Sequence, residues 1–305
     1  MKFRMVLSAL LLAAGLACCT ADSVESMTVA LPENVKLELV KVEAGTFTMG
    51  APDGENFADE EEHLVTLTRD FYIGKTEVTQ AQWEAVMGSN PSHFKGGDLP
   101  VECVSWDDAM AFCKKLNDSG KAPNGMKFTL PTEAQWEYAV RGGKKSNGYQ
   151  YSGSGNLDEV AWYYENSGDR RLDEKELLKD SSDASSVQKL EDNNVVPEVA
   201  VDFDKLDKNL KDNNSKTHPV GQKKANELGL HDMSGSVWEW CLDQYEGDYA
   251  DDPEFLSGNA GTRYVFRGGG WRGSAGGCRS ANRHGHTHDY SCYDLGFRVA
   301  LVPAQ

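Results

Sequence analysis

The chain has 305 residues and is strongly acidic, with 31 Lys and Arg against 48 Asp and Glu and a formal net charge of −17. Its length admits one large domain or two smaller ones, and a hydrophobic content of 39% is sufficient for a core. The charge excludes nucleic acid as a partner, because phosphate binding requires a basic surface.

The first residues have the pattern of a bacterial export signal. A basic start precedes an apolar run, residues 5–16, which is too short to span a bilayer. Small residues then precede Cys18 and Cys19, and either cysteine suits lipidation. Residues 1–18 are therefore predicted to be a lipoprotein signal peptide and residues 19–34 a polar tether, which attaches the protein to a membrane through a lipid. An ordinary secretion signal with coincidental cysteines is the alternative.

Short predicted elements, separated by Gly, Asn and Asp turns, follow from residue 35 to the end of the chain. Alternating hydrophobicity predicts strands at residues 37–42, 45–50 and 63–73. Helices are predicted at residues 79–87, 105–116 and 132–140, each beginning at a Ser or Thr that can cap the first turn. The tryptophans in or beside predicted elements are expected to pack in the core: Trp83, Trp106, Trp136, Trp238 and Trp240.

One stretch, about residues 168–216, differs in composition and is dense in Asp, Glu, Lys, Ser and Asn. It is longer than an ordinary connection between elements, which predicts an insertion. We expect a solvated surface excursion in which residues 173–190 could form an amphipathic helix.

The chain ends in an unusual segment, Tyr264 to Leu301, called the C-terminal segment below. It begins and ends with strand-like residues, and the region between them is rich in Gly, Ser, Arg, His and Tyr with almost no aliphatic residues. Such a composition cannot form a core, but it can present side chains to a ligand.

Six motifs occur in a fixed order along the chain. They are residues 45–50 (GTFTMG), 75–83 (KTEVTQAQW), 100–106 (PVECVSW), 130–138 (LPTEAQWEY), 229–240 (GLHDMSGSVWEW), and 267–269 (RGG) with 296–298 (GFR). Together they resemble the formylglycine-generating-enzyme, or sulfatase-modifying factor, family. The resemblance implies an α+β, C-type lectin-like fold that forms one irregular, loop-rich domain over residues 35–305.

The same resemblance implies a structural calcium ion. Carried over by position, its ligands are the side chains of Asp232 and Glu239 and the backbone carbonyls of Gly235 and Val237. Hard oxygen ligands from a tight loop suit calcium. The alternative is that Asp232 caps a turn and Glu239 pairs with an arginine such as Arg267 or Arg298.

The enzymes of this family use two cysteines in a Cys-x4-Cys pattern to bind copper(I). Counted forward from residues 267–269, the two positions are Gly273 and Cys278; counted back from residues 296–298, they are Gly270 and Ala275. Neither count supplies two thiols, so no copper and no catalysis are expected. The five cysteines after the signal leave disulfides such as Cys278–Cys292 or Cys103–Cys241 open.

Three alternating histidines, His284, His286 and His288, could face one way on a strand as metal ligands do. Their Gly-, Asn- and Thr-rich surroundings favour an exposed cluster in a loop instead.

The preferred hypothesis is a non-catalytic display scaffold that binds a ligand through the C-terminal segment. The chain resembles the retroelement-diversified variable lipoproteins of spirochaetes (treponeme variable-protein type), which implies a lipid-anchored monomer of the bacterial cell envelope at the outer-membrane surface. Its partner would be an unidentified protein or glycan on another cell or host surface. The alternative is a formylglycine-generating-type oxidoreductase that acts on a cysteine of a protein substrate. The residues predicted to contact the ligand are Arg272, Gly273, Ser274, Gly276, His284, His286, His288, Asp289, Tyr290, Ser291 and Tyr293.

Overall fold

The computed structural model describes residues 25–52, 59–173, 187–191, 194–198, 203–245 and 262–304. The predicted signal peptide with Cys18 and Cys19 lies outside these residues. No helix in the described ranges is long and apolar enough to cross a membrane.

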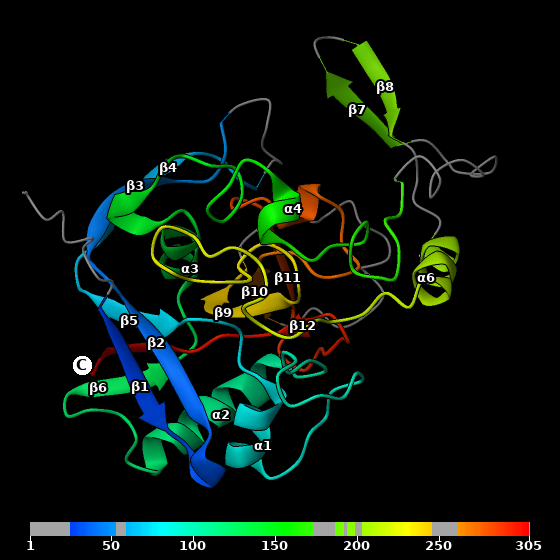
Figure 1. The fold of residues 1–305 in the computed structure, drawn as a ribbon. Coiled ribbons are helices and arrows are strands. Elements are labelled where there is room, and N and C mark those ends of the chain that lie inside the picture. The colour runs from blue at the N-terminus through cyan, green and yellow to red at the C-terminus, as the bar shows by residue number, and fades with distance from the viewer. Residues whose placement is uncertain are drawn as a thin grey trace, which may run out of the picture.

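Two sheets and a set of short helices form the body of the α+β fold (Figure 1). The five-stranded sheet has the order β1 (Ser26–Ala30), β2 (Lys36–Val42), β5 (Phe71–Gly74), β13 (Ala300–Pro303) and β6 (Met126–Thr129). The four-stranded sheet has the order β11 (Arg283–Thr287), β10 (Arg263–Arg267), β9 (Trp238–Gln244) and β12 (Leu295–Gly296). Two hairpins pair β3 (Gly45–Met49) with β4 (His63–Leu67) and β7 (Val187–Glu191) with β8 (Asn194–Glu198).

The helices are α1 (Gln80–Met87), α2 (Trp106–Asp118), α3 (Glu133–Val140), α4 (Leu157–Val160) and α6 (Phe203–Asp212), with 3-10 turns at Pro32–Asn34, Gly143–Lys145 and Gly276–Cys278. The three predicted caps are confirmed, because Thr79, Ser105 and Thr132 each accept a backbone hydrogen bond in a complete capping box. The predicted strand at residues 63–73 is two strands in different sheets, β4 and β5.

The predicted tether is wrong for the described residues 26–34. β1 lies in this range and pairs antiparallel with β2, from Ser26 opposite Val40 to Ala30 opposite Lys36. Val29 and Leu31 are buried in the main hydrophobic cluster. The ordered domain therefore begins before residue 35, because alternate apolar side chains give this short stretch a face to bury.

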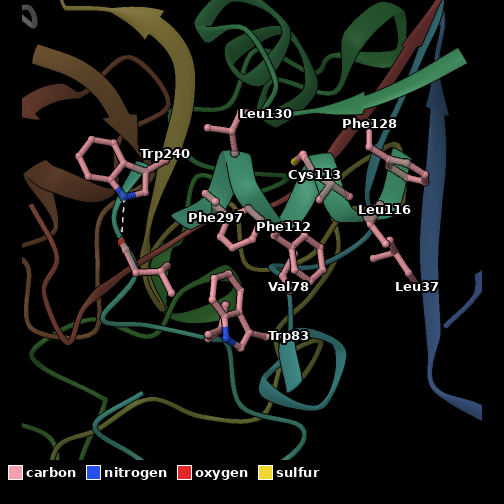
Figure 2. Close-up of a cluster of buried hydrophobic side chains, with 14 of the residues drawn as sticks. Leu37, Val78, Trp83, Phe112, Cys113, Leu116, Phe128, Leu130, Trp240 and Phe297 are labelled. Atoms are coloured by element: carbon pink, nitrogen blue, oxygen red, sulfur yellow. Dashed lines mark hydrogen bonds between the residues drawn. The ribbon is translucent and has the colours of Figure 1, made fainter. Parts of the chain in front are cut away.

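The main hydrophobic cluster joins the first half of the chain to its end (Figure 2). Trp83 of α1 stacks on Phe112 of α2 with ring centres 5.6 Å apart. Phe297 packs edge-on against Phe112 at 5.5 Å. Trp240 of β9 donates its indole N–H to the Val104 carbonyl at 3.1 Å. These contacts fix the end of the C-terminal segment to α1 and α2.

The ends of the insertion belong to the folded body, which corrects the expectation of a solvated excursion for these parts. Its base is closed by a hydrogen bond from the Asp169 N–H to the Asn213 carbonyl at 2.8 Å. Leu172 and Leu210 are buried in a cluster with Trp271 of the C-terminal segment. The expected helix at residues 173–190 is wrong at its described end, because residues 187–191 are a strand; residues 174–186 lie outside the described ranges.

Candidate functional site

Three buried arginines anchor the C-terminal segment to the body. Arg267 contacts the carboxylates of Glu133, at 3.2 Å, and Glu137. Arg279 binds Glu60 at 2.8 and 2.9 Å through its two terminal nitrogens. The third pair, Arg298 with Glu239, is described with the carboxylate cluster below. Since each buried guanidinium requires its partner, the three pairs hold the frame of the segment at Arg267, Arg279 and Arg298.

All eleven residues predicted to contact a ligand reach the surface at least in part. Five are exposed, namely Ser274, Gly276, His288, Asp289 and Ser291. Six are half-buried, namely Arg272, Gly273, His284, His286, Tyr290 and Tyr293. They fall into two groups. One group lies on β11 and in the residues just after it, and the other, which includes Arg272 and Tyr293, lies beside α6.

The histidines of the first group lie beside the aromatic rings of β9 and β10 on one face of the four-stranded sheet. His284 and His286 are opposite Phe266 and Tyr264 in the β10–β11 register, and their side chains share a face by strand alternation. Trp238 of β9 packs edge-on against His284 at 5.0 Å. We call these five residues the aromatic face. The two histidines therefore lie on a strand, and their expected loop position is wrong.

The start of α2 extends the aromatic face. Trp106 stacks on Tyr264 with ring centres 3.9 Å apart, and His286 stacks on Tyr290 at 3.7 Å. The Asp107 carboxylate lies 2.6 Å from Nδ1 of His288. Sequence reasoning assigned Trp106 and Trp238 to the core, but both remain half-buried. The alternation of Tyr264 and Phe266 in a predicted strand was the signal that could have pointed to a shared face.

The three histidines differ in environment, and the described residues do not bring them together in a group that could hold a metal. Burial lowers the pKa of His284 and of His286, whereas the hydrogen bond to Asp107 raises the pKa of His288. The His288 pair is thus stabilising in acid, and its contribution is lost as the pH rises through the raised pKa of His288. His286 has the opposite pH dependence. Because burial lowers its pKa, the protein loses stability as the pH falls from the ordinary histidine pKa towards the lowered pKa of His286.

We predict that these two histidines titrate on opposite sides of the ordinary histidine pKa, with His288 above it and His286 below it. Imidazole NMR titration of the folded protein measures both values. Asp107→Asn should return the pKa of His288 to the ordinary range and leave that of His286 unchanged. Equal pKa values in the unaltered protein would contradict the assigned environments.

The second group of predicted residues packs beside α6. The Arg272 guanidinium contacts the Tyr293 hydroxyl and lies 2.8 Å from the Asp207 carboxylate of α6. The Gly273 carbonyl accepts the Tyr164 N–H at 3.1 Å. Sequence reasoning did not find α6 as part of this surface, because the contact joins residues 65 positions apart.

The positions of the copper-binding thiols hold no cysteine pair. Gly273 is one position, and Cys278 at the other is fully buried, so that burial raises the pKa of its thiol to about 12. A Cβ at Gly269 would lie 2.7 Å from the Cys278 sulfur, which shows how tightly the backbone covers it. A thiol needs its thiolate form to bind a metal or attack a substrate, and burial disfavours that form at Cys278.

All five cysteines of the described residues have free thiols, so neither Cys278–Cys292 nor Cys103–Cys241 is bonded. Cys113, Cys241 and Cys278 are buried, whereas Cys103 and Cys292 are half-buried. Burial also raises the pKa of the thiols of Cys103 and Cys292, to about 12 and about 11. We therefore predict that iodoacetamide alkylates these two half-buried cysteines slowly in the native protein at alkaline pH and reaches the other three only after unfolding. Peptide mapping by mass spectrometry distinguishes each site, and native labelling of Cys278 would contradict its burial.

A cluster of buried carboxylates occupies the predicted calcium loop. Glu239 pairs with Arg298 through both of its oxygens, at 2.6 and 2.7 Å, and also accepts the Trp136 indole N–H at 2.8 Å. Asp232, with a left-handed φ of 56°, accepts the Gly221 N–H at 2.5 Å through Oδ2. Glu77 completes the cluster and accepts the Val237 N–H at 3.2 Å. Of the alternative, the arginine on Glu239 is therefore present, whereas the hydrogen bond to the Asp232 carboxylate comes from a residue eleven positions earlier in the chain and is not the cap of a local turn.

The cluster nevertheless fits a cation in part, through Asp232 rather than through Glu239, whose two oxygens both bind Arg298. Oδ1 of Asp232 and Oε2 of Glu77 are buried without a hydrogen-bond partner among the described residues. Burial raises the pKa of both carboxyls. Three buried carboxyl groups against the Arg298 guanidinium leave excess negative charge, which a cation would neutralise. The described residues hold no group of three or more His, Cys, Asp or Glu side chains arranged for a metal, but the implied site needs two such side chains and two carbonyls.

This α+β frame, with anchored arginines and a loop-rich end, matches a known family. The model of the sulfatase-modifying factor enzyme 1-like domain matches residues 28–302, and the chain belongs to this family. The fold is the C-type lectin-like fold of formylglycine-generating enzymes, in one loop-rich domain.

Two relatives that carry different functional names are similar to this chain in sequence. The chain is 37% identical over 289 residues to the chaperone protein LppX of Paenibacillus barcinonensis, covering 85% of this chain and 84% of that protein. It is 31% identical over 229 residues to the formylglycine-generating enzyme of Streptomyces coelicolor, covering 73% of this chain but 59% of the enzyme.

Among solved structures, Treponema denticola variable protein 1 superimposes with a TM-score of 0.66 and 28% identity, covering 91% of this chain and 99% of that protein. PvdO from Pseudomonas aeruginosa, at 23% identity and a TM-score of 0.58, has the same fold.

Proposed function

We propose that this protein is a non-catalytic binding protein of the bacterial cell envelope that presents its C-terminal segment to a protein or glycan ligand. Cys18 or Cys19 would carry the lipid anchor at the outer-membrane surface, and the body would act as a monomer. The segment would be a target of retroelement diversification, as in the variable-protein type that the chain resembles.

One observation carries this proposal: the frame of the C-terminal segment is buried and charge-paired, whereas the predicted contact residues between the anchors reach the surface. A rigid frame with replaceable surface residues is what a display scaffold requires. The similarity to Treponema denticola variable protein 1 supports the same assignment.

Two experiments test the proposal. Purified protein is screened on arrays of extracellular proteins and glycans, together with a variant carrying His286→Ala, Tyr290→Ala and Tyr293→Ala. A ligand should bind the unaltered protein and bind the variant at least about tenfold more weakly. For the retroelement origin, the gene should lie near a reverse transcriptase gene and a template repeat that differs only at adenines. If the locus lacks both features, the retroelement origin is refuted, and the array screen remains the test of ligand binding.

The oxidoreductase alternative has a separate test. A sulfatase-derived cysteine peptide is incubated with the protein, copper and O₂, and aldehyde is measured by mass spectrometry. We expect none, because a single buried thiol cannot form a bis-thiolate copper site. Aldehyde formation at enzymatic rates would overturn the non-catalytic proposal.

The relative named as a chaperone supports a second candidate, in which the half-buried rings of the aromatic face bind apolar segments of non-native proteins. This candidate predicts that the protein suppresses aggregation of chemically denatured citrate synthase at stoichiometric amounts. The display proposal predicts no such suppression, so light scattering separates the two.

We further propose that a structural calcium ion binds at Asp232 and Glu239 with the carbonyls of Gly235 and Val237, where it would neutralise the carboxylate cluster. Calcium should then raise the Tm of the protein after treatment with a chelator, because a ligand of the native state stabilises it. Asp232→Ala should abolish this rise, and Asp118→Ala, at an exposed carboxylate outside the cluster, should retain it. Equal Tm values with calcium and with chelator would contradict the site, and elemental analysis measures the bound metal directly.

A further inference from the structure

A cavity of about 590 Å³ lies between α6 and the C-terminal segment. We call it the α6 cavity. Its lining includes Trp271 and Tyr293 of the C-terminal segment, Phe94 of the loop after α1, and Lys211 and Lys216 of the insertion. Its volume is within the range of small-molecule sites.

One wall of the α6 cavity is aromatic and held rigidly. Phe94 packs edge-on against Trp271 at 5.5 Å, and Tyr293 lies 5.7 Å from Trp271. The Trp271 indole N–H donates to the Tyr293 carbonyl at 3.1 Å, and His93 adds a further ring 5.7 Å from Tyr293. Preformed aromatic walls bind the flat apolar side of a ligand with little loss of conformational entropy.

The charges of the cavity point to one anionic group on that ligand. Among the described residues, neither the Lys211 nor the Lys216 ammonium makes a hydrogen bond or an ion pair. Asp207 is neutralised by Arg272, and Asp169 accepts the Asn214 amide at 2.6 Å. Two cations in one cavity that have no partner among the described residues are unexpected in a chain with a net charge of −17, and they favour a carboxylate or phosphate.

The remaining polar groups select between these anions. Lysine ammonium groups act as point charges and bind carboxylate and phosphate alike, so the choice between these anions depends on the carboxylates of the lining. The carboxylates of Asp169 and Asp207 would repel a doubly charged group but can accept hydrogen bonds from hydroxyls. The combination suits a ring with an apolar side, several hydroxyls and a single negative charge.

We propose that the α6 cavity binds a sugar acid, a hexuronic or nonulosonic acid residue of a glycan, with its ring against Tyr293 and Phe94 and its carboxylate on Lys211 and Lys216. This inference rests on the proposed function, because the cavity shares Trp271 and Tyr293 with the C-terminal segment, and it gives that function a ligand chemistry. It also assigns a role to the insertion, which supplies both lysines.

Isothermal titration of the full chain with methyl β-D-glucuronide, with the methyl glycoside of N-acetylneuraminic acid and with neutral methyl β-D-glucoside tests the proposal. At least one sugar acid should bind at least about tenfold more tightly than the glucoside, since a charge-assisted hydrogen bond is lost with the carboxylate. Sodium acetate at equal concentration should not compete, because it lacks the ring. Equal affinity for the glucoside, displacement by acetate, or no binding of either sugar acid would each overturn the proposal.

Variants locate the site. Lys211→Gln with Lys216→Gln should weaken sugar-acid binding at least about tenfold, and both side chains are exposed, so the fold should be retained. Lys208→Gln on the same helix is the matched control, since Lys208 is paired with Asp212, and it should bind normally. Full binding by the double variant would overturn the assignment to this cavity.

The two proposals can fail separately. A ligand from the arrays that is not displaced by either sugar acid, and that the double lysine variant still binds, would refute the sugar-acid inference and leave the proposed function intact. No ligand on the arrays together with no sugar-acid binding would refute both.

Discussion

Replacing Arg298 with alanine is expected to destabilise the protein by about 3–5 kcal/mol, the cost of removing one partner of a buried ion pair. Arg298 is fully buried and binds Glu239 through two nitrogens. It also donates to the carbonyls of Gly74, at 2.9 Å, and His231, at 3.0 Å. Its removal leaves Glu239 in a cluster with excess negative charge and removes one of the hydrogen bonds that join the end of the C-terminal segment to β5.

Urea unfolding followed by circular dichroism measures the free energy of unfolding. The matched control is Lys75→Ala, because the Lys75–Glu38 pair at 2.9 Å is solvent-exposed and should contribute about 0.2–1 kcal/mol. If both variants lost the same amount, the buried pair would not be the anchor that we describe.

Gly235→Ala is expected to cost about 2–5 kcal/mol. Gly235 has a φ of +77°, a left-handed conformation that costs an L-residue about 1–2 kcal/mol. A Cβ there would also lie 2.3 Å from the Trp162 carbonyl oxygen, an overlap with backbone that requires a shift of the chain, at about 1–3 kcal/mol. The shift would disturb the same loop that holds Asp232 and the proposed calcium carbonyls.

Gly229→Ala separates the two contributions. Gly229 has a φ of +79°, but a Cβ at this position would meet no atom within 4 Å. Its variant should therefore lose only the conformational part, about 1–2 kcal/mol. An equal loss of Tm in both variants would show that the close approach to Trp162 contributes nothing.

Local signals were sufficient for α1, α2 and α3 and for their beginnings, but not for α4 and α6. Thr79, Ser105 and Thr132 cap helices in the structure as predicted, because a capping box is completed within four residues. The strand at the start of the domain was missed, because the short stretch around Val29 is polar enough to read as a tether until its partner β2 is known. A strand is stabilised by its neighbour, which may lie anywhere in the chain.

The candidate site, too, could be predicted only in part from the sequence. The absence of a thiol pair and the surface character of the predicted contact residues could be read from the C-terminal segment itself. The stacking of Tyr264 on Trp106 and the contact of Arg272 with Asp207 could not, since both join residues far apart in the chain.

The sequence by itself determined the family, through its ordered motifs, and the loss of the copper-binding pair, because both depend on residue identity at fixed spacing. Only the tertiary structure decided that Glu239 binds Arg298, that His284 and His286 lie on a strand, and that α6 closes a cavity on the C-terminal segment. Burial and charge pairing are properties of the assembled fold. The physical reason is that desolvation and long-range contacts arise when distant segments pack, and no local pattern records them.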